Sequence, residues 1–297
     1  MQELIDVRSR PPLKEPILIV GFGVRRRGGR SASRALQRIA DSWKSELVAR
    51  IDCEDFIDLT DRRPNIDTSD WRLEWPDTNI YLASPAGSKH DLLLLVGFEP
   101  NFHWSRYADS IATYADSLGV KTLVTVRSFP GEVPHTRPTP ILISSSDIEL
   151  ELQFGVQARG SRYQGPTDVA GVLAARVQDL RWRWADLTAL QPHYFPRMPN
   201  HQLTLTLMRV LDHALGSSTR TTSVQEDARR QIRAIDDSIA GSTESRSAVE
   251  ELESRYDAGA ERMDFLTPPS EESANLPSGE EIVEEIERLF REGGKLD

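Results

Sequence analysis

The stretch LLLLVGFEPNFHW, residues 92–104, decides the fold class, because five apolar residues follow one another without alternation from 92 to 96. A strand of this kind is typically covered on both faces, as in the parallel centre of an α/β sheet. Three further runs have the same character: ILIV (17–20), LVTV (123–126) and ILI (141–143). We therefore expect an α/β fold with a mostly parallel central sheet flanked by helices, in which these four runs are the central strands.

Helical spacing separates the apolar runs, as a succession of β-α-β units requires. It extends over 32–47 after the first run and over 107–118 after the second, and further helices are expected near 147–153, over 167–180 and from Asn200 to a stop at Gly216. WRLEW (71–75) and IYLA (80–83) are interpreted as shorter, more peripheral strands.

The chain divides, by this pattern, into an α/β core domain over 1–216 and an acidic helical extension over 217–297. Capping-box spacing in the extension predicts helix starts at Ser223, Ser247 and Ser278, and a proline-containing linker is expected over 264–277. Each of these helices has one narrow apolar stripe and needs a partner surface. We expect the last stripe, within 282–290, to dock.

Charge and composition exclude several classes of protein. With 38% hydrophobic and 28% charged residues the composition is globular, and the net charge of −10 comes from 217–297, which holds 10 Lys or Arg against 20 Asp or Glu. The other 216 residues hold 26 of each sign, so neither nucleic acid nor an anionic membrane is an expected partner. The longest apolar run has five residues and one cysteine is present, which favours a soluble protein of the reducing cytoplasm.

The loop after the first strand, GFGVRRRGGRSAS (21–33), is the first candidate ligand site. It follows a strand and precedes a helix, where Arg25, Arg26, Arg27 and Arg30 would hold a phosphate or carboxylate. The spacing is neither G-x-G-x-x-G nor a P-loop, and a solvated turn is the alternative interpretation.

Two other strand ends carry candidate catalytic or anion-binding residues. Glu99 follows the strand at 92–96 as a candidate general base or as a turn residue before a proline. His135 and Arg137 follow the strand at 123–126 in a Pro-rich segment, where they form a candidate pair or part of a rigid structural loop.

Motifs for metal, cofactor or nucleophilic chemistry are lacking in the sequence. No H-E-x-x-H, G-x-S-x-G or multi-cysteine pattern occurs, and we expect no metal and no cofactor. Cys53 lies in DCEDF, where neighbouring carboxylates would raise its pKa and suppress the thiolate.

Several separated segments resemble the proteasome assembly chaperone 2 family in its actinobacterial form. They occur in order along nearly the whole chain, and the most specific are GFEPNFHW (97–104), VPHTRP (133–138) and PSGEEIVEEIERLFR (277–291). The resemblance implies a sheet like that of the phosphorylase/hydrolase fold, a C-terminal helical extension, self-association with trimers among the forms, and proteasome-related partners. The family's first loop typically reads G-W-x-D-A-G-x-A-A-S, and here VRRRGGR replaces its aspartate.

Two hypotheses of function follow. The first is a non-enzymatic, homo-oligomeric binding or assembly-chaperone protein that resembles proteasome assembly chaperones. The second is a phosphorylase/hydrolase-like enzyme for a small anionic substrate, with Glu99, His135 and Arg137 in the pocket and the arginines of the first loop on the anion. Convergence of these side chains on one pocket would distinguish the two.

Overall fold

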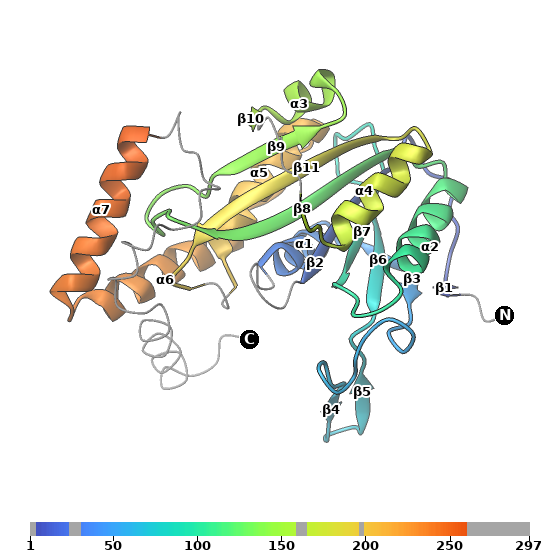
Figure 1. Ribbon diagram of the computed structural model, residues 1–297, viewed down its shortest axis with the longest axis horizontal. Helices are drawn as coiled ribbons and strands as arrows, with labels where there is room; N and C mark the ends of the chain where they lie inside the picture. The colour runs from blue at the N-terminus through green and yellow to red at the C-terminus, as the bar shows by residue number, and fades with distance from the viewer. Residues whose placement is uncertain (1–3, 24–30, 159–164, 196–198, 260–297) are drawn as a thin grey trace.

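A computed structural model of the chain describes residues 4–23, 31–158, 165–195 and 199–259. Within these residues, nine strands form one sheet in the order β1-β3-β6-β7-β2-β8-β11-β9-β10, and β4 and β5 form a separate hairpin (Figure 1). The strands of the large sheet are β1 (Ile5–Val7), β2 (Ile17–Gly23), β3 (Glu46–Ile51), β6 (Thr78–Ala83), β7 (Leu92–Phe98), β8 (Thr122–Gly131), β9 (Ile141–Ser145), β10 (Gln157–Ala158) and β11 (Arg183–Pro192). The hairpin strands are β4 (Asn65–Asp67) and β5 (Arg72–Glu74).

The helices cover both faces of the sheet. They are α1 (Ser31–Ser42), α2 (Trp104–Ser117), α3 (Ile148–Phe154), α4 (Val169–Asp179), α5 (His201–Leu215), α6 (Thr222–Ile239) and α7 (Thr243–Gly259). Alternate residues of β2 belong to opposite layers: Ile17 and Ile19 pack with α1 and α5, whereas Leu18 and Val20 pack with α2 and α4. This two-sided burial is the reason that the strand carries no polar alternation, and it confirms the predicted fold class.

All four apolar runs lie in the large sheet, but one of them is not in its parallel centre. β7, β2, β8 and β11 run parallel to one another, whereas β9 pairs antiparallel with β11 and β6 pairs antiparallel with β7. β11 was not predicted, because Asp186 and Thr188 interrupt its apolar pattern. Both polar side chains lie in a charged cluster described below, which is how a central strand accommodates them.

The helix predicted after β2 is shorter than its spacing indicates. α1 ends at Ser42, and Lys44 adopts a left-handed backbone with φ 53°. Leu47 therefore belongs to β3, where the chain turns back to pair antiparallel with β6.

The starts of α3, α4 and α5 lie within two residues of the predicted positions. Asp147, Asp168 and Asn200 are the N-caps of α3, α4 and α5, and each side chain accepts a backbone N–H three residues on. Gly216 ends α5 with φ 63°, a left-handed backbone that glycine adopts without steric cost.

The predicted capping boxes at Ser223 and Ser247 are wrong. α6 begins at Thr222 and α7 at Thr243, so both serines lie inside helices. The α7 start is stabilised instead by the Ser242 hydroxyl, which accepts the Ser245 N–H at 3.1 Å.

The helices after residue 216 contact the body. α6 packs on α5, and Val224 is fully buried in the core layer that contains α1 and α5. The division of the chain at residue 216 stays a prediction, and the segments 264–277 and 282–290 lie outside the described residues. In the described part of the chain, no helix combines the length and apolarity needed to cross a membrane.

Candidate functional site

The residues singled out from the sequence occupy separate places. Arg25, Arg26, Arg27 and Arg30 lie outside the described residues. Glu99 follows β7 and contacts the start of α4, whereas His135 and Arg137 lie in the loop after β8 and contact α6 and α7. No hydrogen bond or ion pair links Glu99 to His135 or Arg137 in the described residues, so the trio does not form one polar constellation there.

Glu99 joins β7 to α4. Its Oε1 accepts the backbone N–H of Val169, the first residue of α4, at 3.1 Å. Burial raises the pKa of Glu99, and the neighbouring Asp168 carboxylate raises it further, against the effects of the hydrogen bond from Val169 and of Arg62 and Arg127. A carboxylate at a helix N-terminus is a favourable structural contact.

A charged cluster within the sheet connects β8, β11 and the start of α4. Arg127 Nε lies 2.8 Å from Asp186 Oδ1, and its terminal nitrogen lies 3.3 Å from Asp168 Oδ1. Thr125 and Thr188 donate to the Asp186 carboxylate at 2.5 and 2.9 Å. With two carboxylates beside one guanidinium, the charge of Arg127 is already balanced, so this cluster stabilises the sheet and the helix start.

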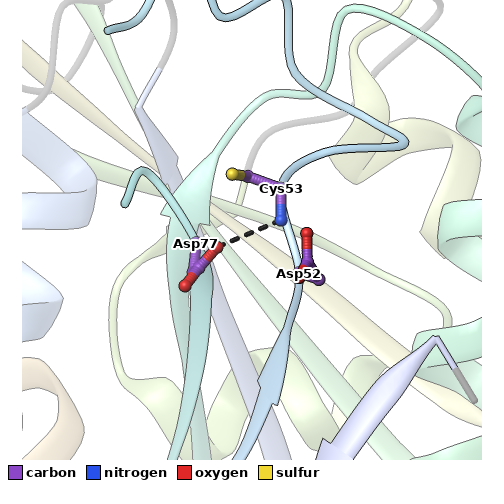
Figure 2. Close-up of side chains that lie close together, drawn as sticks. All are labelled: Asp52, Cys53 and Asp77. Carbon is purple, nitrogen blue, oxygen red and sulfur yellow. Dashed lines mark hydrogen bonds between the residues drawn. The ribbon is translucent and has the colours of Figure 1, made fainter. Parts of the chain in front are cut away.

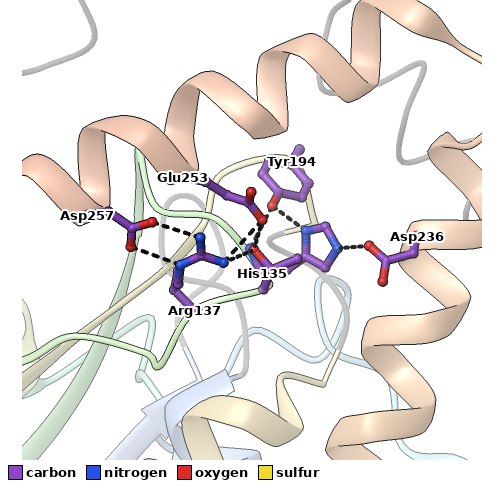
Figure 3. Close-up of polar contacts among 7 residues, drawn as sticks. His135, Arg137, Tyr194, Asp236, Glu253 and Asp257 are labelled. Carbon is purple, nitrogen blue, oxygen red and sulfur yellow. Dashed lines mark hydrogen bonds and ion pairs between the residues drawn. The ribbon is translucent and has the colours of Figure 1, made fainter.

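His135 occupies a buried chain of hydrogen bonds (Figure 3). Its backbone N–H donates to the Tyr194 hydroxyl oxygen at 2.8 Å, and that hydroxyl lies 2.7 Å from Nδ1. The Asp236 carboxylate of α6 only accepts hydrogen bonds, so Nε2 carries the ring hydrogen and donates it to Asp236 Oδ1 at 3.0 Å. Nδ1 is then the acceptor, and the Tyr194 hydroxyl donates its hydrogen to it. Burial lowers the pKa of His135, although hydrogen bonding to Asp236 opposes the shift. The neutral imidazole is thus committed at both nitrogens.

Arg137, two residues after His135, binds α7. Its Nε and one terminal nitrogen lie 2.9 and 2.8 Å from the two Asp257 oxygens, and the other terminal nitrogen lies 3.3 Å from Glu253 Oε1 (Figure 3). The bidentate geometry is the strong form of an Arg–carboxylate pair. Arg137 therefore has its charge satisfied by α7 rather than offered to a ligand.

Neighbouring residues add to this attachment. Thr136 donates to Glu253, the Tyr256 hydroxyl donates to the Pro138 carbonyl at 3.0 Å, and Arg255 pairs with Glu132 at 2.5 Å. We call the contacts of loop 132–138 with Tyr194, α6 and α7 the arm clamp. The loop begins where β8 ends, beside the end of β11, and α6 and α7 lie beyond these two strand ends (Figure 1).

The arm clamp explains what His135 and Arg137 do chemically. A general base needs a free lone pair and an anion site needs an open donor, and the clamp uses both kinds of group for internal contacts. The contacts of the Pro-rich loop favour the interpretation as a structural loop, and they link it to two helices.

Among the described residues, one group has donor atoms close enough together for a metal ion. It consists of Asp52, Cys53 and Asp77, whose donor atoms lie within 4.8 Å of one another (Figure 2). Burial, and then hydrogen bonding to Asp77, raises the pKa of Cys53 to about 12, so the thiol stays protonated at neutral pH. Asp77 also accepts the Cys53 N–H at 3.1 Å and pairs with Arg50 at 3.2 Å. These contacts anchor the turn after β3 and give a metal ion little free ligand charge.

Sequence reasoning missed the partners of the candidate residues. Arg127 and Asp186 had a detectable signal, because each is a charged residue within an otherwise apolar strand. For the other partners, Asp236, Glu253 and Asp257, the sequence held no signal beyond an acidic helix face, because the residues they contact are more than 100 positions away.

The model of the PAC2 family matches residues 29–239. No curated protein matches the chain in sequence. Among solved structures, a PAC2 family protein from Streptomyces avermitilis is 28% identical with a TM-score of 0.69, over 80% of this chain and 99% of that chain.

Two other solved structures extend the comparison. A proteasome-assembly chaperone homologue from Mycobacterium tuberculosis is 30% identical with a TM-score of 0.68, over 78% of this chain and 99% of that chain. A Corynebacterium glutamicum protein of unknown function is 20% identical with a TM-score of 0.77, over 88% and 99% of the two chains, and shows the same fold.

Proposed function

The chain belongs to the PAC2 family, and from that premise we propose that it is a non-enzymatic, assembly-chaperone-like protein with proteasome-related partners. The observation that carries the proposal is the 30% identity to the Mycobacterium tuberculosis proteasome-assembly chaperone homologue over almost all of that chain. Self-association, with trimers among the forms, and a cytoplasmic location complete the proposal.

The arm clamp supports a binding role over a catalytic one. His135 and Arg137, the best catalytic candidates of the sequence, hold α6 and α7 in place. α7 presents exposed acidic side chains such as Glu244, Glu250 and Glu251, so a basic protein surface is the complementary partner for this helix.

Reconstitution with purified components tests the proposal. The intact chain is mixed with separately purified α and β proteasome subunits of an actinobacterium, and assembly is followed by native gel and peptidase activity. We expect a complex of the chain with an assembly intermediate and faster formation of active particles. Unchanged assembly kinetics with no complex at about 10 μM chain, a concentration at which interactions worth roughly 7 kcal/mol are detected, would contradict the proposal.

A further inference from the structure

The β4–β5 hairpin is an exposed, apolar projection of the protein. It extends away from the large sheet (Figure 1), and every residue of both strands is exposed. Its large apolar side chains are open to solvent: Ile66 by 50%, Trp71 by 76%, Leu73 by 47% and Trp75 by 41%. A two-stranded hairpin is marginally stable alone in water, and a contiguous apolar patch marks an interaction site.

The backbone of the hairpin supports the same interpretation. Trp71 has φ 56°, a left-handed conformation that is unfavourable for a large side chain. Trp71 ends the turn over 68–71 that joins the two strands, and its indole is exposed.

β5 has one free edge. It pairs with β4 through Asn65–Glu74, Ile66–Leu73 and Asp67–Arg72, and no other described strand pairs with either of them. Half of the β5 backbone groups therefore face away from β4, as in any edge strand, and are available to a further strand.

The sequence of this edge is complementary to itself. An antiparallel pairing of β5 (Arg72–Glu74) with β5 of a second copy, centred on Leu73, places Leu73 opposite Leu73, and Trp71 and Trp75 flank the paired strands. It also places each Arg72 opposite a Glu74. Opposite charges that lie directly across antiparallel strands stabilise the pairing. The five residues 71–75 have no net charge.

We propose that β5 pairs with β5 of a second copy of this chain across a two-fold axis at Leu73, which joins two hairpins into a four-stranded sheet. The inference rests on the self-association proposed above and names a surface for it. A two-fold contact closes on itself, so alone it produces dimers, and together with a three-fold contact it would produce hexamers.

The available area makes this a reversible contact. Two partly exposed tryptophans, with Ile66 and Leu73, present on the order of 400 Å² of apolar side chain per copy, since an aromatic side chain buries about 150–250 Å². A standard interface buries about 800 Å² per partner. Association through this surface should therefore depend on concentration and respond strongly to charge.

Charge exchange at the two facing positions tests the register. Arg72→Glu alone places glutamates opposite glutamates, and Glu74→Arg alone places arginines opposite arginines. Each single variant should self-associate about tenfold more weakly, because two cross-strand pairs change from attraction to repulsion. An equimolar mixture of the two variants restores the opposite charges, and so does the double variant Arg72→Glu/Glu74→Arg.

The double variant also serves as a control for contacts within one hairpin. Arg72 also faces Asp67 and pairs with Asp70 at 3.4 Å, so Arg72→Glu introduces repulsion inside its own hairpin. The double variant retains that internal repulsion, and its recovery therefore reports the contact between copies. Lys89→Glu is the matched control, with the same change of charge in an exposed loop at the other end of β6.

Sedimentation equilibrium and native mass spectrometry of the full chain are the measurements. Weakened association of both single variants, with recovery in the mixture and in the double variant, is the expected result. Wild-type association that neither single variant changes would overturn β5 pairing while leaving self-association intact. Loss without recovery would overturn the two-fold register, and a monomeric wild-type chain would overturn both this inference and the proposed self-association.

Discussion

Removing the Tyr194 hydroxyl should destabilise the arm clamp by about 2–6 kcal/mol. This hydroxyl accepts the backbone N–H of His135 at 2.8 Å and lies 2.7 Å from Nδ1, and both residues are buried. Tyr194→Phe leaves the N–H and Nδ1 without a partner, and a buried unsatisfied group costs about 1–3 kcal/mol. The loss is a large part of a typical unfolding free energy of about 5–15 kcal/mol.

Urea unfolding of the wild-type and Tyr194→Phe chains measures the free energy, and hydrogen exchange over α7 measures whether the helix is released. Tyr114→Phe is the matched control, because the Tyr114 hydroxyl is buried and has no hydrogen-bond partner in the part of the chain that the structure describes. We expect the control to change stability by less than about 0.5 kcal/mol, since no hydrogen bond is lost. A Tyr194→Phe variant as stable as this control would refute the hydrogen-bond chain described for His135.

Three other results are expected. Gly97→Ala should cost about 1–3 kcal/mol in thermal or urea unfolding, because its Cβ would lie 2.2 Å from Thr78 Oγ1 in the core; a neutral effect would mean that Thr78 moves freely. Arg137→Lys should increase hydrogen exchange in α7 with little change in the sheet, since lysine cannot form the bidentate pair with Asp257; unchanged protection would contradict the clamp. The free energy of unfolding should fall as the pH drops below 6.5, because burial lowers the pKa of His135 in the folded chain and the unfolded chain then binds more protons. His135→Gln should reduce the slope of the unfolding free energy against pH, and an identical slope would exclude this residue as a cause.

The sequence by itself determined the class of fold and much of its local detail. Unalternated apolar runs predicted two-sided burial, because a central strand exposes neither face to water. Asn200 and Gly216 predicted the start and the end of α5, because capping depends on residues within a few positions of the terminus. The family resemblance also came from local segments, and the match over 29–239 confirms it.

Only the tertiary structure decided where the candidate residues act. β11 lies between β8 and β9 although it follows both in the chain, and it accommodates Asp186 because Arg127 of the neighbouring strand pairs with that carboxylate and Thr188 donates to it. His135 and Arg137 became parts of a clamp because α6 and α7, 101 to 120 residues later, place carboxylates beside them. Charge pairing is set by distance in space, and periodicity along the chain carries no information about which distant helix supplies the partner.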